Sequence, residues 1–265
     1  MVRVGLVGCG TIGSRVARAI QRDLAHVARI SALHDVDPSR ALRLQRRLRP
    51  QPPLCSLPQL ISRCDLVVEA ASVGAVAAVV SRALAAGRDV FVMSVGGLLQ
   101  DQRWRRLAAR GRLHVPSGAL AGLDGVKAMA IGGGLKRASL TTRKPPKALA
   151  LAPSLVGRRL ERLRRPTVVF DGTPRAVVKA FPQNTNVAAA LALASGLPDR
   201  RIRVRVVADP AIRMNRHEVD VEGDCGRIRC QVESRPSANP KTSELAVRSA
   251  IATLHRIFDR ISIGT

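Results

Sequence analysis

Hydrophobic and polar positions in the first 120 residues predict strands that alternate with helices. The segment VRVGLVGCG (2–10) is apolar up to its glycines, and Ile12, Val16, Ile20 and Leu24 follow at the spacing of one helix face. The same pattern predicts further strands at 28–35, 64–71, 89–97 and 112–119, and further helices at 38–48, 73–87 and 100–111. Apolar strands that alternate with helices are typical of a parallel sheet covered on both faces. We therefore expect an α/β, doubly wound domain over 1–122.

The pattern changes from residue 123 onward and predicts a second, α+β domain with an open sheet over 123–238. Its expected strands lie at 134–149, 166–172, 201–210, 215–223 and 226–236. A helical pair at 173–195 is interrupted by Pro182. The last segment, 239–265, contains one amphipathic helix, which we expect to return to the first domain.

The strand NRHEVDVEG (215–223) places a histidine on the side of the sheet that we expect to be buried. Alternation puts Asn215, His217, Val219 and Val221 on one face and the charged residues on the other. Most buried polar groups are structural and hydrogen-bonded, so a core histidine is one interpretation. A functional histidine is the other, and the strand alone does not decide between them.

The net charge of +25 changes the range of possible partners. It comes from 44 Lys and Arg against 19 Asp and Glu, and such an excess is typical of nucleic-acid binding. However, the basic residues are dispersed, and the chain has no Tyr, four Phe and one Trp on which bases could stack. We therefore expect no specific nucleic-acid partner. The alternative that is not an enzyme is a basic nucleotide-binding module that engages nucleic acid without turnover.

Cysteine content and hydropathy argue against a disulfide-rich secreted protein, a metal-binding protein and a membrane protein. The five cysteines are scattered, odd in number and without an accompanying histidine cluster, so we predict reduced thiols, no disulfide framework and no metal site. The N-terminus lacks the pattern of a signal peptide, and the longest apolar run, 73–80, is far too short for a bilayer. The expectation is a soluble, cytoplasmic protein without a membrane partner.

A glycine motif follows the first predicted strand and opens the first predicted helix. Gly8, Gly10 and Gly13 match G-x-G-x-x-G, which alone is a weak signal. Its position between a strand and a helix, with Asp35 at the end of the second strand, gives the full context of a dinucleotide site. Gly8 would allow the tight turn, Gly10 the approach of the pyrophosphate, and Gly13 the close packing of helix and strand.

The same motif predicts how NAD or NADP would be held. The pyrophosphate would lie at the N-terminus of the helix, against the free N–H groups near Thr11 and Ile12. Asp35 would accept hydrogen bonds from the adenosine ribose, and its charge would repel the 2′-phosphate of NADP. The residues leave the preference between the two cofactors open.

Five motifs in the order of the chain resemble the L-aspartate dehydrogenase family. They are PSGALAGLDGVKA (116–128), TTRKPP (141–146), FPQNTNVAAALALA (181–194), ADPAIRMNRHEVDVEG (208–223) and NPKTSELAVRSAIATL (239–254). The resemblance implies a dinucleotide-binding domain with an inserted catalytic domain, similar in architecture to dihydrodipicolinate reductase. It also implies oxidation of L-aspartate by NAD or NADP to iminoaspartate, which yields oxaloacetate and ammonia or feeds pyridine nucleotide biosynthesis, in a homodimer.

The resemblance also assigns roles to single residues. It implies that Ala119 and Asn186 contact the dinucleotide, and that His217 is the catalytic residue on an apolar face that keeps its imidazole neutral. A dicarboxylate needs cationic anchors, for which the motif TTRKPP offers Arg143 and Lys144. Each has another interpretation, because Asn186 can cap the following helix and the basic pair can be solvated. The alternative enzyme is a related imine or aldehyde reductase of the dihydrodipicolinate reductase or homoserine dehydrogenase type.

Overall fold

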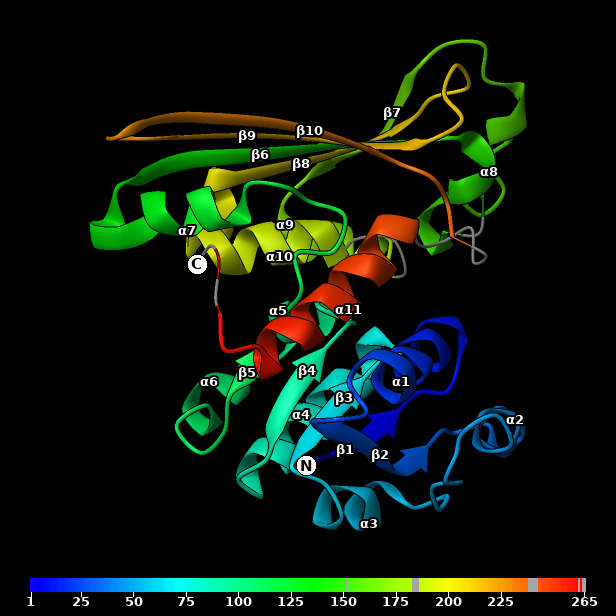
Figure 1. Cartoon of the computed structure of the whole chain (residues 1–265). Helices are drawn as coiled ribbons and strands as arrows, with labels where there is room; N and C mark the ends of the chain where they lie inside the picture. The colour runs from blue at the N-terminus through cyan, green and yellow to red at the C-terminus, as the bar shows by residue number, and fades with distance from the viewer. Residues whose placement is uncertain (151, 183–185, 238–242, 262, 264–265) are drawn as a thin grey trace. The chain divides into compact units, whose positions relative to one another are not determined.

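The computed structural model describes residues 1–150, 152–182, 186–237, 243–261 and 263. It divides the chain into two compact units (Figure 1). Unit 1 comprises Met1–Pro116 and Ala250–Arg260, and unit 2 comprises Ser117–Ser249 and Ile261–Thr265. Parts of two motifs, residues 183–185 and 239–242, lie outside the described residues.

Unit 1 is built on a five-stranded parallel sheet with the order β2-β1-β3-β4-β5. Its strands are β1 (Val2–Val7), β2 (Ala28–His34), β3 (Leu66–Glu69), β4 (Asp89–Val92) and β5 (Leu113–His114). The chain runs outward from β1 to β2 and then returns to β3 on the other side of β1, so the order reverses between β1 and β3. In open parallel sheets, ligands bind at the carboxyl ends of the strands at such a point.

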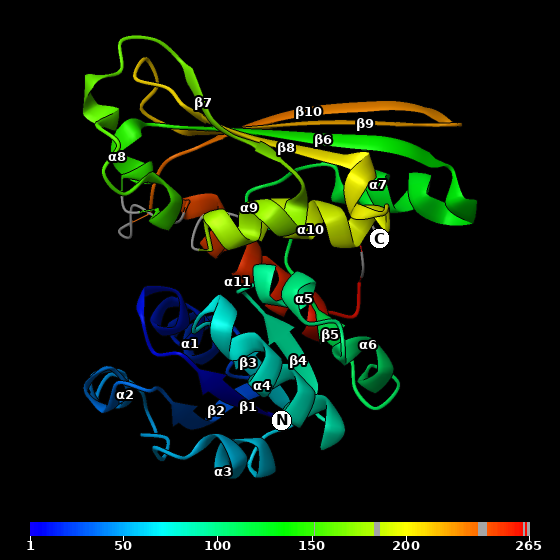
Figure 2. The same cartoon turned by 180° about the vertical axis from the view of Figure 1, so that it is seen from behind.

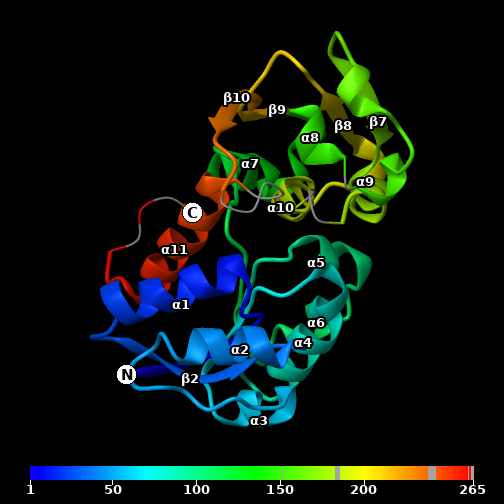
Figure 3. The same cartoon turned by 90° about the vertical axis from the view of Figure 1, so that its right-hand side faces the viewer.

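Helices cover the sheet of unit 1 because the connections between parallel strands cross over its faces. They are α1 (Thr11–Asp23), α2 (Pro38–Gln45), α3 (Leu57–Ser62), α4 (Val73–Ala85), α5 (Gly96–Gln100) and α6 (Trp104–Leu107). Val16 and Ile20 of α1 and Leu44 of α2 pack with Leu254 of α11 (Glu244–Phe258) in one core cluster. The second half of α11 lies beside α1 (Figure 3).

The α/β, doubly wound fold expected for this part of the chain is confirmed, with local differences. The predicted helix 100–111 is not continuous, since α5 ends at Gln100 and α6 begins only at Trp104. Between them Asp101 turns the chain, and its Oδ1 accepts the N–H of Arg103 at 2.9 Å. A short polar side chain that bonds nearby backbone competes with helix formation.

Unit 2 contains a five-stranded mixed sheet with the order β10-β9-β6-β8-β7. Its strands are β6 (Leu135–Lys144), β7 (Thr167–Gly172), β8 (Ile202–Ala208), β9 (Asn215–Gly223) and β10 (Gly226–Ser234). Only β6 and β8 pair in parallel, and the other neighbours are antiparallel. This open sheet confirms the predicted α+β architecture of the second part.

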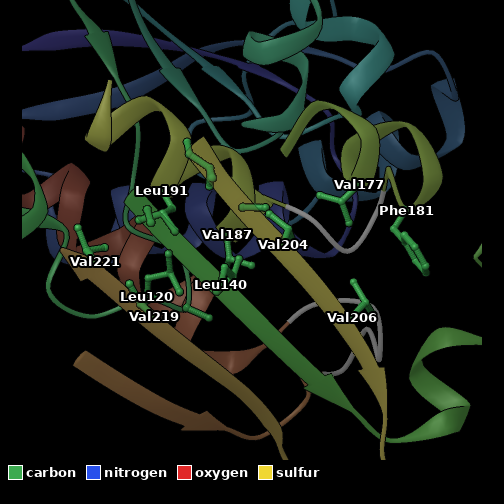
Figure 4. Packing of buried hydrophobic residues seen from close by; sticks show 14 of the residues in the cluster. Leu120, Leu140, Val177, Phe181, Val187, Leu191, Val204, Val206, Val219 and Val221 are labelled. Carbon is green, nitrogen blue, oxygen red and sulfur yellow. The ribbon is translucent and has the colours of Figure 1, made fainter. Parts of the chain in front are cut away.

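Helices cover one face of this sheet (Figures 1 and 2). The helices of unit 2 are α7 (Leu123–Ala130), α8 (Pro146–Leu149), α9 (Pro174–Ala180), α10 (Asn186–Ser195) and the first half of α11, with short 3-10 turns at Ile131–Gly133, Pro153–Leu155, Leu160–Arg162 and Asp199–Arg201. Leu140 of β6 and Val219 of β9 point toward Val187 and Leu191 of α10 (Figure 4). The core of unit 2 therefore lies between the sheet and its helices.

Among the described residues, no helix is long and apolar enough to cross a membrane.

We predict that Leu140→Ala destabilises the protein by about 2–5 kcal/mol, the usual loss for removing a buried leucine side chain. Leu140 is 1% exposed and its neighbours across the strands are Val204 and Val219, which are held in regular pairing and cannot close the cavity. Chemical denaturation measures the change. Val156→Ala, at a side chain that is 77% exposed, is the control and should leave stability within about 0.5 kcal/mol of the wild type.

Candidate functional site

The core face of the unit 2 sheet changes from apolar to polar along β6 and β9. Leu140 and Val219 are paired across these strands, and both are buried. Two residues further along each strand, Thr142 and His217 form the next pair on the same face, and both are again buried. The face that packs the core thus becomes a polar site toward the end of β6 and the start of β9.

A second row of buried polar side chains lies one step beyond this pair. Arg143 and Arg216 are the last paired residues of β6 and β9, so continuing the register brings Lys144 opposite Asn215. On the other side of β9, Asn215 pairs with Ser234 of β10. Lys144, Asn215 and Ser234 are 4%, 1% and 7% exposed, and we call these three residues the polar row.

His217 is held as a neutral imidazole. Its Nδ1 is 3.1 Å from the Thr142 hydroxyl. This hydrogen bond fixes the orientation of the ring, and Nε2 is the ring nitrogen that takes no part in it. Burial lowers the pKa of His217 to about 3, and the positive charge of Lys144 contributes to the shift. The proton-accepting form is therefore present at every pH at which the protein would be assayed.

Lys144 brings a cation into the same buried site. Burial lowers its pKa to about 8, because removing the ammonium group from water disfavours the charged form. The side chain still carries its proton in most molecules at neutral pH. A buried ammonium is costly to desolvate, so it is typical of a site that binds an anion.

Arg143 lies on the opposite face of the sheet from Lys144, since neighbouring residues of a strand alternate. Its Nε donates to Glu218 Oε1 at 2.9 Å, and its Nη1 is 4.0 Å from Asp209 Oδ2. The structure thus brings Lys144 together with His217, and holds Arg143 in an ion pair elsewhere. A substrate contact by Arg143 stays an untested prediction.

The glycine loop of unit 1 has two glycines that the fold itself requires. Gly8 has a φ of +94°, and a Cβ at this position would press against the backbone of Ala70. A Cβ at Gly13 would collide with the carbonyl oxygen of Gly8. By contrast, a Cβ at Gly10 would meet nothing within 4 Å, so the fold does not explain this glycine. Open space over Gly10 fits the approach of a pyrophosphate.

The start of α1 and the end of β2 meet at this loop. α1 begins at Thr11 without a side-chain cap on Gly10, which leaves the N–H groups of its first turn, including that of Ile12, for an anion. Asp35 Oδ2 accepts the N–H of Cys9 at 2.6 Å, and its Oδ1 accepts the N–H of Asp37. Asp35 therefore lies against the glycine loop, and its oxygens retain lone pairs for ribose hydroxyls.

Glu69, at the end of β3, is a buried residue that the sequence analysis missed. Its carboxylate accepts the N–H of Ala71 at 2.8 Å and both the N–H and the hydroxyl of Ser94 at 2.9 Å. Burial raises its pKa. It ties the loop after β3 to the loop after β4, and the first of these loops contains Ala70, which packs against Gly8. The sequence does contain a signal for this residue, because a carboxylate at the end of an apolar strand is unusual and indicates a buried polar contact.

Ala119 and Asn186 belong to unit 2. Ala119 is 2% exposed and follows Gly118, whose N–H donates to the Ser249 hydroxyl at 3.1 Å. Ser249 also bonds Ser117, so this segment is fixed to α11. Asn186 is half-buried and is the first residue of α10. Their contact with a dinucleotide stays a prediction.

Comparisons with known proteins match the whole chain. Residues 124–257 match the family model described as aspartate dehydrogenase, C-terminal, and residues 8–114 match the model described as homoserine dehydrogenase, NAD binding domain. Relatives named L-aspartate dehydrogenase are 44% identical in Methanosarcina barkeri and 39% in Methanocella arvoryzae, with complete coverage of both chains. The chain belongs to the aspartate dehydrogenase family.

Solved structures agree with this family assignment. The crystal structure of aspartate dehydrogenase from Thermotoga maritima matches all of both chains with a TM-score of 0.74 and 27% identity. A scyllo-inositol dehydrogenase from Lactobacillus casei, with a TM-score of 0.57 and 14% identity, shares the fold alone. The predicted family, an NAD-binding domain and the use of a nicotinamide cofactor are confirmed.

For this member of the family, we predict that Gly10→Ala weakens the binding of NADH, whereas Gly13→Ala lowers the stability of the fold. Gly10→Ala should keep stability within about 1 kcal/mol of the wild type, since only the N-cap preference changes. It should weaken NADH binding at least about tenfold, because the methyl group would occupy the space for the pyrophosphate. Gly13→Ala should instead lose about 1–3 kcal/mol of stability through overpacking.

Thermal unfolding and NADH fluorescence titration on the same preparations measure the two effects. If Gly10→Ala bound NADH as the wild type does, the pyrophosphate would not lie over Gly10.

Proposed function

We propose that this chain is an L-aspartate dehydrogenase that uses NAD or NADP. Aspartate loses a hydride from Cα and a proton from nitrogen to give iminoaspartate, and water converts this imine to oxaloacetate and ammonia. The observation that carries the proposal is the neutral His217 beside the buried cation of Lys144. Family membership supports the choice of aspartate.

The residues of unit 1 fit a nicotinamide dinucleotide, which would accept the hydride when bound. Gly10 leaves room for the pyrophosphate, and the first turn of α1 supplies N–H donors. Asp35 offers its carboxylate to the ribose, and its negative charge favours NAD over NADP. Ala119 and Asn186 are proposed as further contacts of the dinucleotide.

His217 and Lys144 have different roles at the substrate. Lys144 binds a carboxylate of aspartate and fixes Cα for hydride loss, so that positioning supplies part of the rate. His217 Nε2 takes a proton from the water that attacks the imine carbon, while Thr142 holds Nδ1. Because the charge of Lys144 helps to depress the pKa of His217, a carboxylate bound to Lys144 makes the imidazole a stronger base.

The alternative is a related imine or aldehyde reductase, which would share the dinucleotide-binding domain. A substrate screen that follows NADH and NADPH absorbance separates the two, with L-aspartate, homoserine and dihydrodipicolinate as the test compounds. Turnover of L-aspartate at least about tenfold above every other compound supports the proposal, since a site built for polar groups rejects analogues that leave them unpaired. Preference for another compound overturns it.

Family membership also supports the remaining expectations, which stay proposals. They are a homodimer, a cytoplasmic location and a contribution to pyridine nucleotide biosynthesis. Light scattering coupled to gel filtration measures the first. Electrophoretic mobility shift over a salt series tests the nucleic-acid alternative, because binding driven by phosphates weakens steeply as salt rises.

His217→Asn should reduce kcat by about 10²–10⁴-fold, the range for loss of a positioned acid–base group. The affinity for NADH should remain near that of the wild type, since the glycine loop and Asp35 belong to unit 1. Stopped-flow and steady-state absorbance measure the rate, and thermal unfolding is followed in parallel. A histidine with only a core role predicts the reverse result, a destabilised variant with normal kcat.

Lys144→Met should raise the KM for aspartate at least about tenfold, as expected for losing a charge-assisted hydrogen bond. Lys144 loses its proton as the pH rises through about 8, so inhibition by succinate should weaken above that pH in the wild type. The variant should lack this dependence. Steady-state kinetics with aspartate measures the change in KM. The Ki for succinate over pH 6–10 measures the pH dependence in the wild type and its loss in the variant.

Arg143→Ala is the matched control for Lys144→Met, because it removes the neighbouring cation from the opposite face. An unchanged KM would assign Arg143 to its ion pair with Glu218. An increase of about tenfold or more would support the predicted contact between Arg143 and substrate.

A further inference from the structure

Two buried polar atoms next to His217 have no hydrogen-bond partner among the described residues. They are Asn215 Oδ1 and Ser234 Oγ, and both belong to the polar row. Their side chains are 1% and 7% exposed. Nearly all buried polar groups in folded proteins are hydrogen-bonded, and an unsatisfied one destabilises the fold. Two such atoms on adjacent strands therefore indicate a group that binds there.

The register places these atoms within reach of one small ligand. Asn215 and Ser234 are direct partners across β9 and β10, and the register of β6 and β9 brings Lys144 to the other side of Asn215. Side chains paired directly across antiparallel strands have Cβ atoms about 4.5–5.5 Å apart. The polar row thus presents an ammonium, an amide oxygen and a hydroxyl over about 10 Å.

The chemistry of these groups distinguishes the two ends of an amino acid. Lys144 can only donate and attracts an anion, whereas Asn215 Oδ1 can only accept. A carboxylate beside Lys144 leaves a cationic N–H group as the natural partner of Asn215 Oδ1. The Ser234 hydroxyl can accept a second N–H or donate to the adjoining carboxylate.

We propose that Asn215 and Ser234 form the subsite that receives the α-amino group of the substrate. Asn215 Oδ1 accepts an N–H of that group, so the enzyme discriminates amino dicarboxylates from dicarboxylates without an amine. His217, two residues from Asn215 on the same face of β9, lies next to the nitrogen and carbon that react. The inference rests on the proposed function and deepens it, because it assigns the amine to one end of the polar row.

The test compares ligands that have an amino group with ligands that lack one. Asn215→Leu keeps the size of the side chain and removes the acceptor. In the direction of reductive amination, it should raise the KM for ammonium at least about tenfold, the scale of one hydrogen bond to a charged group. The KM for oxaloacetate and the Ki for succinate should change less than about twofold, since neither molecule carries nitrogen.

Ser234→Ala and Ser195→Ala form a matched pair of buried serines. Ser195 is 4% exposed, and its hydroxyl donates to the carbonyl of Ala192 at 3.2 Å. Ser195→Ala should lower the melting temperature and leave the KM for ammonium unchanged. Ser234→Ala should keep or raise the melting temperature and raise the KM for ammonium, since its hydroxyl bonds no described residue.

The outcomes separate this inference from the proposed function. If the wild type does not oxidise aspartate, the proposed function fails. If it does, and Asn215→Leu changes the constants for ammonium and succinate equally or changes neither, the assignment of the amino group is overturned. A loss of melting temperature in Asn215→Leu with unchanged constants would likewise make Asn215 structural.

Discussion

The register between β6 and β9 is the constraint on which the site depends. Thr142 is paired with His217, and Leu140 with Val219, so both strands turn the same alternate residues toward the helices. A slip of one residue would exchange the two faces of a strand. It would expose the valines and leucines that pack against α10, and it would also turn His217 to solvent. Hydrophobic packing at one end of the strands thereby fixes the chemistry at the other.

Burial gives His217 and Lys144 properties that neither has in water. Removal from solvent lowers both pKa values, to about 3 and about 8. The ammonium of Lys144 adds to the burial that keeps His217 neutral, whereas burial alone lowers the pKa of Lys144. A negative ligand beside Lys144 would favour its protonated form and raise the pKa of His217. Burial thus brings a neutral imidazole and an ammonium group into one desolvated site, which is typical of functional sites.

The sequence predicted most of the helices and strands, but it did not predict the contacts of every site residue. Alternation along 215–223 placed His217 on the buried face, and the glycine spacing located the dinucleotide loop. In the motif TTRKPP, however, the sequence did not distinguish Arg143 from Lys144 as the anchor of a substrate carboxylate. Strand alternation separates them, and Lys144 shares the buried face of β6 with Leu140 and Thr142. The partner of Arg143 is Glu218, 75 residues away, and a contact of such long range is not encoded in local spacing.

The basic surface and the buried lysine act at different ranges. On the outer face of the sheet, Arg143 pairs with Glu218 and Arg216 with Glu233, so these arginines are partly neutralised. The remaining excess of the +25 charge produces a long-range field that attracts dicarboxylates and dinucleotides alike, and salt screens it. Such a field raises the rate of encounter without distinguishing one anion from another. Among the described residues, Lys144 is the one buried cation, where screening is weak. Selection of a carboxylate therefore requires the desolvated lysine on the core face, whatever the charge of the surface.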